Sequence, residues 1–509
     1  MTFRVLTTPL PVSPREPAQR DGGIDPSALG GFLIRPGLEA PLERLRDPGV
    51  LVVTTGQQPA LFTGPVYTVF KALSAAALAA VLEERWERPV VPVFWIAGDD
   101  HDWEEARSAS WLGADDTLVT ASLRNRPASD PMAPLSREPL GAEVGAALEL
   151  LNETLAGTPH REHVLQWLGA HFTPDTMLAA ASGAALADLL APFGIVCFDS
   201  TLPAVKRGAA RHLVKALGLA ADLDRDLGRR AAELANEERD AGIAVGDGAT
   251  LVMLDDAGGR DRLVLVDGGF ETRRGGERFT LEQLHGIAAS EPERLSANVL
   301  LRPVIESALL PTVAYCAGPG ELRYLPLCRP VFERMRIHRP EPVPRWSGLV
   351  VEAFADRAAR KFRIPVADIA DPSAAVTARA VRDRIPDATR GAIDSLRDEL
   401  ARRYRDLGEQ VAALDPTLER PVDGALGRSL DALDRVDRKL VRSVRRRHEI
   451  ELRQLLRART ALLPGGKPQE RVLTAASFLA RHGPAVFEEC ARAAAGWYQG
   501  ALEGRALIA

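Results

Sequence analysis

The chain has 509 residues, of which 46% are hydrophobic and 26% are charged, and its formal net charge at pH 7 is −5. This length predicts two or three folding units with a sizeable core, and the composition excludes a largely disordered chain. Because the charges nearly balance, there is no electrostatic signature of nucleic-acid or anionic-membrane binding, and we expect small-molecule substrates.

The cysteines point to a reducing compartment. They lie far apart and form no CxxC pair, which argues against a disulfide framework and against an all-cysteine zinc site. The four are Cys197, Cys316, Cys328 and Cys490. The N-terminal residues lack the apolar segment of a signal peptide, and no run of about 18 apolar residues follows. We therefore expect a cytoplasmic protein without a membrane anchor.

The first elements along the chain alternate between strand and helix. Residues 50–54 form a β-branched apolar run that predicts a buried strand, residues 66–84 have the Ala and Leu spacing of a helix, and residues 89–97 predict a second strand. Residues 193–199 and the apolar run that begins at Leu309 predict further strands. This alternation is typical of an α/β fold with a Rossmann-like parallel sheet, in which ligands bind at the carboxyl ends of the strands.

Two segments interrupt this pattern within the catalytic region, which we place at residues 1–370. The first, at about 120–190, is predicted to be helical. The second, at about 240–290, alternates strand-like runs with Gly-rich turns and predicts an antiparallel hairpin subdomain.

After Asp371 the composition changes to that of long charged helices. Apolar residues recur at intervals of three and four from Ile393 to Leu414 and again from Leu426 to Leu455, with the sequence DPTLERPVDG between them. This pattern predicts an antiparallel coiled-coil hairpin at 371–461, serving as a scaffold or a dimer interface. Residues 462–509 are expected to form a turn and a helix that pack back on the core.

The first candidate loop, TTGQQPALFTGPVYTVFK, occupies residues 54–71 between a predicted strand and a helix. Its glycines, hydroxyls and amides can approach a polar ligand closely. The candidate binding residues are Thr55, Gly56, Gln57, Gln58, Thr63, Gly64 and Tyr67. Lys71 either stabilises developing negative charge or faces water, and the glycines alternatively serve only a tight turn.

The second candidate loop, GDDHDWEE at residues 98–105, places carboxylates around an imidazole directly after an apolar strand. Such crowding perturbs pKa values, so Asp100 and His101 are candidate general bases and Asp99 a binding residue. The same residues suit a hard metal ion, whose presence the sequence leaves open. Acidic residues also favour helix N-termini, and this loop alternatively only caps a helix.

A third loop, AGPGELRY at residues 317–324, follows another strand and offers Gly318, Gly320, Glu321 and Tyr324. Loops that follow parallel strands meet at one edge of the sheet, so we expect the three to form one site. A Gly-rich turn, LLPGGKPQERV at residues 462–472, offers Lys467, Gln469 and Arg471 as a second candidate anion site. It alternatively only ends a helix.

The sequences of these four motifs, with the second extended to PVFWIAGDDHDWEEA, resemble those of the bacillithiol biosynthesis cysteine-adding enzymes, also called cysteine ligases. Several motifs in one order over nearly the whole chain are more specific than any single motif. The resemblance implies a Rossmann-like core with inserted segments, a coiled coil and a homodimer. It also implies the last step of bacillithiol biosynthesis, the addition of cysteine to the amino group of glucosaminyl-malate.

Amide formation at neutral pH needs an activated carboxyl group and a deprotonated amine. We expect cysteine to be activated, with ATP and magnesium as the cofactors to test, and Asp100 or His101 to accept the proton of the attacking amine. Cys316 stands where the family pattern usually has an apolar residue, which argues against a covalent role. Two alternatives stay open: a metal-dependent hydrolase built on the DDHD segment, and a non-catalytic scaffold that binds small molecules.

Overall fold

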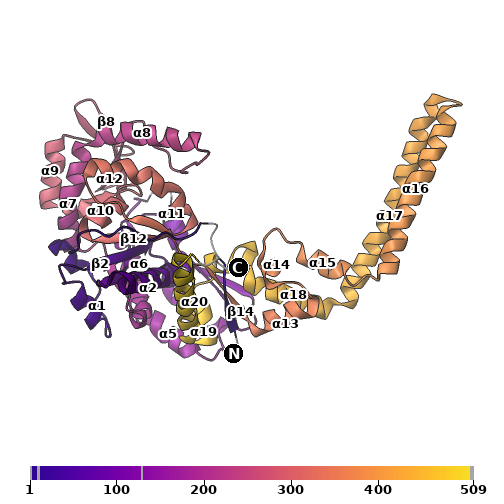
Figure 1. Ribbon diagram of the computed structural model, residues 1–509, viewed down its shortest axis with the longest axis horizontal. Helices are drawn as coiled ribbons and strands as arrows, with labels where there is room; N and C mark the ends of the chain where they lie inside the picture. Colours follow the sequence, from indigo (N-terminus) through magenta and orange to yellow (C-terminus); the bar gives the residue numbers. More distant parts are fainter. Residues whose placement is uncertain (1–2, 9–11, 128–129, 505–509) are drawn as a thin grey trace. The chain divides into compact units, whose positions relative to one another are not determined.

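The structure is a computed structural model that describes residues 3–8, 12–127 and 130–504. The chain divides into two compact units, of which the first comprises Thr2–Val350 and Gln469–Ala509. The second comprises Val351–Pro468. Figure 1 shows the helices and strands of both units with the labels used below.

The first unit is built on a five-stranded parallel sheet, which confirms the predicted Rossmann-like core. Its strand order is β13-β12-β2-β3-β6, and every neighbouring pair is parallel. The strands are β2 (Leu51–Gln57), β3 (Val90–Ile96), β6 (Val196–Asp199), β12 (Thr312–Ala317) and β13 (Glu341–Pro344). Their carboxyl ends lie at one edge, as parallel pairing requires.

Both faces of this sheet are buried, which explains why its strands are apolar runs instead of alternating ones. Val52, Val91 and Trp95 belong to the same buried cluster as residues of α7 (Pro203–Gly218) and α10 (Arg302–Leu309). On the opposite face, α2 (Tyr67–Trp86) packs on β2 and β3 and against α20 (Ala485–Leu502), while α6 (Leu178–Leu190) packs on β6. The predicted helix at 66–84 is thus confirmed as α2.

The first inserted segment begins with a hairpin and continues as helices. Strands β4 (Ser108–Leu112) and β5 (Leu118–Ser122) pair antiparallel. Helices α4 (Glu143–Thr154), α5 (Arg161–Gly169) and α6 follow. Within the segment expected to be helical, at about 120–190, these α-helices cover residues 143–154, 161–169 and 178–190, and β5 and connecting chain precede them.

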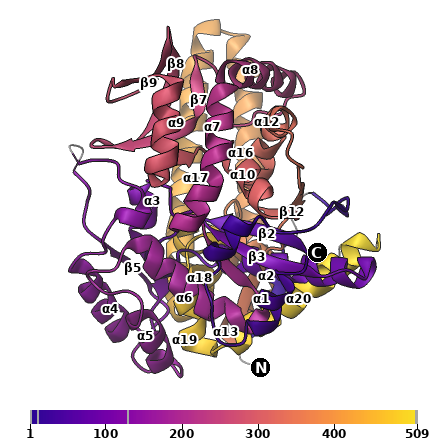
Figure 2. The ribbon, with the colours of Figure 1, turned by 90° about the vertical axis from the view of Figure 1, so that its left-hand side faces the viewer.

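The second inserted segment is the predicted antiparallel subdomain. Five strands pair in the order β10-β9-β8-β7-β11, all antiparallel. They are β7 (Ala249–Asp256), β8 (Gly259–Val266), β9 (Gly269–Thr272), β10 (Arg278–Phe279) and β11 (Leu295–Ala297). Figure 2 shows β7 beside α7, with α9 (Leu281–Ser290) in front. The end of β11 leads the chain back to the parallel sheet.

The remaining elements lie in the first unit, except that β14 continues past its boundary at Val350. They are β1 (Phe3–Thr7), which pairs with β14 (Gly348–Glu352), and α1 (Glu39–Arg44), α3 (Trp103–Ala106), α8 (Ala220–Asn236), α11 (Pro319–Tyr324), α12 (Arg329–Met335) and α19 (Ala475–His482).

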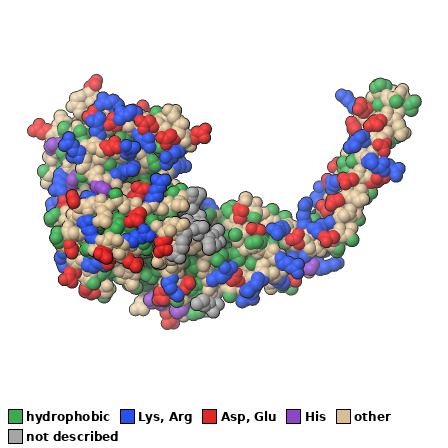
Figure 3. All heavy atoms as spheres, viewed as in Figure 1, with side chains coloured by type: hydrophobic (Ala, Val, Ile, Leu, Met, Phe, Trp, Pro, Cys, Tyr) green, Lys and Arg blue, Asp and Glu red, His purple; other side chains and the backbone are tan. Residues whose placement is uncertain are grey.

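The second unit is helical, and its longest helices form the predicted antiparallel hairpin. The elements are α13 (Ala353–Phe362), α14 (Val366–Ala370), α15 (Val376–Arg382), α16 (Asp387–Ala412), α17 (Glu419–Arg447) and α18 (Glu449–Leu462). Helices α16 and α17 pack along each other, and charges of both signs are mixed along them (Figure 3).

Three boundaries of this unit differ from the sequence analysis. The unit begins at Val351, ahead of the composition change at Asp371, because α13 and α14 pack on α18. Helix α17 starts at Glu419, inside the sequence expected to break the pattern, because a proline is tolerated in the first turn of a helix. The second long helix is also divided at His448, whose φ of −108° and ψ of 22° are not helical.

The described part of the chain contains no helix that is both long and apolar enough to cross a membrane. All four cysteines are buried and unpaired. Burial raises the pKa of the Cys316 thiol to about 12, which suits a core residue and not a nucleophile.

We predict that His482, at the end of α19, makes the first unit sensitive to mild acid. Burial, Arg481 and His160 lower its pKa to about 4, whereas an unfolded histidine titrates near 6.5. Between these two pKa values, His482 binds a proton in the unfolded chain but not in the folded chain. The free energy of unfolding should therefore fall as the pH drops from about 6.5 towards 4. Since the ring is partly exposed, the loss should be on the order of 1 kcal/mol.

Urea unfolding at pH 7.5 and at pH 5 measures this effect. His482→Gln should lose less stability between the two pH values than the unaltered protein. His285→Gln, at an exposed position of α9, serves as the matched control. An equal loss in all three proteins would show that His482 does not contribute.

Candidate active site

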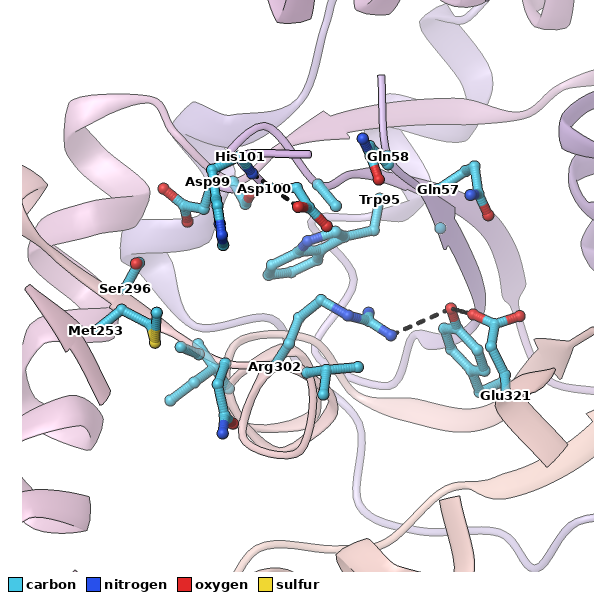
Figure 4. Close-up of a pocket in the computed structure, with 18 of the residues that line it drawn as sticks. Gln57, Gln58, Trp95, Asp99, Asp100, His101, Met253, Ser296, Arg302 and Glu321 are labelled. Carbon is cyan, nitrogen blue, oxygen red and sulfur yellow. Dashed lines mark hydrogen bonds between the residues drawn. The ribbon is translucent and has the colours of Figure 1, made fainter. Parts of the chain in front are cut away.

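A cavity of about 590 Å³ lies in the first unit, where the carboxyl ends of β2, β3 and β12 meet. Its walls come from the three loops that follow these strands, from α7 and α10, and from the antiparallel subdomain. Figure 4 shows Gln57 and Gln58 from the first loop, Asp99 to His101 from the second and Glu321 from the third around Trp95. This is the place at which α/β sheets bind ligands.

The structure brings most of the predicted site residues to this one cavity. Those that line it are Gly56, Gln57, Gln58, Tyr67, Lys71, Asp99, Asp100, His101, Gly318, Gly320, Glu321, Tyr324 and Arg471. Those that do not are Thr55, Thr63, Gly64, Lys467 and Gln469. Gly56 is needed for close approach, since a Cβ there would lie 2.7 Å from the carbonyl oxygen of Trp95.

Thr55, Thr63 and Gly64 shape the first loop instead of lining the cavity. The Thr55 hydroxyl donates to the Cys316 carbonyl at 2.8 Å and so ties β2 to β12. Thr63 is buried and has a positive φ of 69°, next to Phe62 with a φ of 49°. Such a turn is strained for residues other than glycine. The fully buried Phe62 ring, packed edge-on against Phe172, holds it in place.

Lys71 joins the first loop to the third. Its ammonium group is only 1% exposed and donates to the Gly56 carbonyl, to Gln57 Oε1 at 3.3 Å and to Glu321 Oε2 at 2.7 Å. Three acceptors require three N–H donors, which only the charged form of lysine has. The expected role of Lys71 in stabilising developing charge therefore does not fit its geometry, because every donor is already used.

The partner of Lys71 is held as a carboxylate. Burial alone would raise the pKa of Glu321, but Lys71, Tyr315 and the Gly318 N–H together hold it below its ordinary value. The Tyr315 hydroxyl donates to Glu321 Oε1 at 2.6 Å and the Gly318 N–H donates to Oε2 at 2.8 Å. Burial lowers the pKa of Lys71 and Glu321 opposes that effect. We conclude that the two form a buried ion pair.

Hydrogen bonds through Tyr315 link this ion pair to α10. Arg302 donates to the Tyr315 hydroxyl at 3.2 Å and to Glu306 Oε2 at 2.8 Å. Burial raises the pKa of Glu306, with Arg302 acting against it. One hydrogen-bonded network therefore extends from α2 to α10 through residues that line the cavity.

The second loop presents its acidic residues in different directions. Asp99 accepts from Lys206 of α7 at 2.5 Å and is thereby paired. Asp100 uses Oδ1 to accept the backbone N–H groups of His101 and Asp102, at 2.7 and 3.2 Å. Its Oδ2 has no protein donor among the described residues, so Asp100 keeps an accepting atom in the cavity wall.

His101 is fixed in one protonation state by the antiparallel subdomain. Nδ1 lies 3.1 Å from a terminal nitrogen of Arg260, and a guanidinium group can only donate. Nδ1 therefore accepts, and a neutral imidazole must carry its proton on Nε2. Burial and Arg260 lower the pKa of His101, which favours this neutral form. His101 is thus a hydrogen-bond donor, which disagrees with the expected role as a general base.

Glu105 and Tyr67 form the wall between the first and second loops. Burial and the neighbouring Asp102 and Asp100 raise the pKa of Glu105. Burial and Glu105 raise the pKa of Tyr67 to about 12, so its phenol is neutral, and Gln57 Nε2 donates to its oxygen at 2.9 Å. Gln58 Nε2 donates to the Asp102 carbonyl at 2.8 Å and joins the two loops.

The C-terminal turn contributes to the same cavity instead of forming a second anion site. Both ends of the Gln469 amide are hydrogen-bonded to the backbone of Val350. Its Oε1 accepts from the Val350 N–H, and its Nε2 donates to the Val350 carbonyl, both at 3.0 Å. Glu470 pairs with the buried Arg345. Arg471 lines the cavity, whereas Lys467 belongs to the other compact unit.

Among the charged side chains that line the cavity, cations outnumber anions. Seven Lys and Arg side chains face it against four Asp and Glu side chains, which favours anionic substrates. The described residues include no group of three or more His, Cys, Asp or Glu set to hold a metal ion. Asp99 is paired with Lys206 and His101 faces Arg260, so the DDHD segment does not fit the hydrolase alternative.

Several residues that line the cavity were not among the candidates chosen from the sequence. They are Glu105, Lys206, Arg260, Arg302, Tyr315 and Arg345. Glu105 lies within the second loop motif and Tyr315 lies just before the third. Their positions in the sequence could therefore have identified them as candidates. The basic residues lie on α7, α10, β8 and the end of β13, far from any Gly-rich loop. Only the pairing of the strands and the packing of the helices bring them to the site.

Comparison with protein families and curated proteins gives one consistent result. The family model for "Bacillithiol biosynthesis BshC, N-terminal Rossmann-like domain" matches residues 32–346. The model for "Bacillithiol biosynthesis BshC, C-terminal coiled-coil domain" matches residues 348–495. The resemblance inferred from the sequence motifs is thereby confirmed.

Similar curated proteins carry the name "Putative cysteine ligase BshC". One from Prosthecochloris aestuarii is 29% identical over 470 residues, covering 88% of this chain and 82% of that protein. Relatives from Heliobacterium modesticaldum and Symbiobacterium thermophilum are 30% and 31% identical, with 89% and 88% of this chain and 83% of each relative covered.

We predict that Lys71 and Glu321 stabilise the fold as a pair. Lys71→Met leaves the Glu321 carboxylate buried without its cation and should cost about 3–5 kcal/mol of unfolding free energy. Glu321→Gln should also destabilise, because the ammonium loses its anion. The double variant should lose clearly less than the two single losses added together, as measured by urea unfolding. Strict additivity would contradict the pairing.

Proposed function

The chain belongs to the bacillithiol biosynthesis BshC family, and we propose that it is a ligase that joins the carboxyl group of cysteine to the amino group of glucosaminyl-malate by an amide bond. The observation that supports this proposal best is the cavity, in which three loops of the parallel sheet meet a cationic wall. A sugar conjugate with carboxylates and an amino group matches such a wall in charge and in hydrogen-bonding groups.

The proposed reaction makes two demands on the site. The new bond joins the carbonyl carbon of cysteine to the sugar nitrogen. One carboxyl oxygen leaves with the activating group, and the neutral amine loses one proton and keeps one N–H. The carboxyl group must therefore be activated, and a protein group must accept a proton from the attacking amine.

Asp100 is the proton acceptor that we propose. Its Oδ1 is fixed by two backbone N–H groups, which leaves Oδ2 in the cavity wall to accept from a substrate amine. His101 acts differently, because Arg260 holds Nδ1 and leaves the Nε2 proton for donation. We propose that it donates to a substrate oxygen. Glu105, with its raised pKa, is an alternative acceptor at the same wall.

We further propose ATP with magnesium as the source of activation. The cationic lining suits the phosphate charge, and the apolar part of the wall, with Val205, Leu213 and Ile305, suits a ring. When bound, ATP would supply the activating group for the cysteine carboxyl. Arg260 and Arg302 are the lining residues with which its phosphates would pair.

A cytoplasmic homodimer completes the proposal. Four buried, unpaired cysteines suit a reducing compartment. Exposed apolar residues on the long hairpin, including Leu396, Leu407 and Val436, suit an interface between two copies.

We predict that the purified protein converts cysteine and glucosaminyl-malate to the amide product. Mass spectrometry of reactions with and without ATP and magnesium measures both the product and the cofactor requirement. Product only with ATP supports activation by nucleotide. No product under any condition, from protein shown to be folded, would contradict the ligase proposal.

We predict that Asp100→Asn lowers the rate of product formation by about 100-fold or more, since it removes the proton acceptor. Asp102→Asn is the matched control, because Asp102 lies two residues away and caps α3, a role that asparagine also fills. Its rate should stay within a few-fold of the unaltered enzyme. Equal rates in both variants, with Glu105→Gln inactive, would transfer the role to Glu105.

A further inference from the structure

Arg345 presents unused hydrogen-bond donors to the cavity. It follows β13, its side chain is 1% exposed, and it lines the cavity wall. Burying a guanidinium group is costly unless its donors are satisfied. Any N–H donor of Arg345 that the protein does not satisfy must therefore find its acceptor in the cavity.

The protein uses only one end of the Arg345 guanidinium group. One terminal nitrogen donates to Glu470 Oε2 at 2.9 Å and to the Trp346 carbonyl at 3.0 Å. The other donates to Glu470 Oε1. Since the group has five N–H donors, these three bonds leave two: the Nε–H and the neighbouring N–H of the second terminal nitrogen. These two point the same way along one edge of the planar group.

The unused edge faces the third loop. Nε is buried and has no hydrogen-bond partner among the residues that the structure describes, and it lies 3.7 Å from the point that a Cβ would occupy on Gly318. Gly318 lines the cavity. Two parallel donors on a planar edge match the two oxygens of a carboxylate, or two oxygens of a phosphoryl group.

Arg471 adds positive charge to the same cavity lining. The guanidinium carbons of Arg345 and Arg471 each lie 5.8 Å from the centre of the Tyr67 ring. The hydrogen bonds of Gln469 to Val350 fix the turn from which Arg471 projects.

The surrounding carboxylates do not cancel this charge. Glu470 is paired with Arg345, and Glu321 is paired with Lys71. Glu105 interacts with Arg471, but it has a raised pKa. Arg471 therefore forms no ion pair with a carboxylate among the described residues, and it lines the same cavity as Arg345.

We propose that the free edge of Arg345, together with Arg471, is an oxyanion subsite of this cavity that binds a carboxylate of the acceptor substrate. The subsite rests on the proposed function only for the identity of that substrate. A phosphoryl group has the same donor requirements, so the test separates the two sources.

The test uses binding, independently of turnover. Isothermal titration of the full-length protein with L-malate and with inorganic phosphate measures both anions. Arg345→Lys keeps the charge but removes the planar edge, and Arg471→Gln changes an exposed side chain that folding does not require. Arg492→Gln, at an exposed position of α20, is the matched control.

We expect both test variants to bind L-malate at least about 10-fold more weakly, because a charge-assisted bidentate contact is lost, and the control to bind it unchanged. Weaker binding of phosphate alone would assign the subsite to a phosphoryl group. Unchanged binding of both anions in Arg471→Gln and in folded Arg345→Lys would overturn the subsite, as would the absence of binding to the unaltered protein. Product formation, measured separately, decides the ligase proposal itself.

Discussion

The burial of one ammonium group organises the site. Lys71 lies on the first helix after β2, where the fold buries it completely, so its charge must be satisfied by acceptors in the protein. The Gly56 carbonyl and the Glu321 carboxylate meet this need. Since these acceptors belong to different loops, satisfying one cation holds the two loops together and fixes the edge of the sheet at which the cavity opens.

Other parts of the cavity wall depend on this framework through shared partners. Glu321 accepts from Tyr315, which in turn accepts from Arg302 of α10. On the opposite wall, the antiparallel subdomain delivers Arg260 to His101 and so decides that the imidazole donates. A segment inserted far along the chain therefore sets the protonation of a residue in the second loop.

The agreement between sequence and structure is uneven for physical reasons. Buried parallel strands are contiguous apolar runs, so β2, β3, β6 and β12 were predictable, and with them the loops that follow. The division of the long helix at His448 was not, because the apolar spacing continues across it. Thr63 and Gln469 carry suitable groups for binding, but Thr63 is buried outside the cavity lining. The Gln469 amide is already hydrogen-bonded to the Val350 backbone of β14. The resemblance carried by the loop motifs identified the family, and the composition alone would not have done so.

The sequence by itself determined the parallel sheet, the inserted hairpin subdomain, the coiled coil and the three loops that meet in one site, because local periodicity and strand order dictate these features. Only the tertiary structure decided which side chains are free to act. All three donors of Lys71 are hydrogen-bonded, and Asp99 is paired with Lys206. His101 has its proton on Nε2 available for donation, and one edge of the Arg345 guanidinium group has no acceptor among the described residues. Each of these outcomes depends on a partner distant in the sequence, and hydrogen-bond donors and acceptors are assigned only when the folded chain brings those partners within reach.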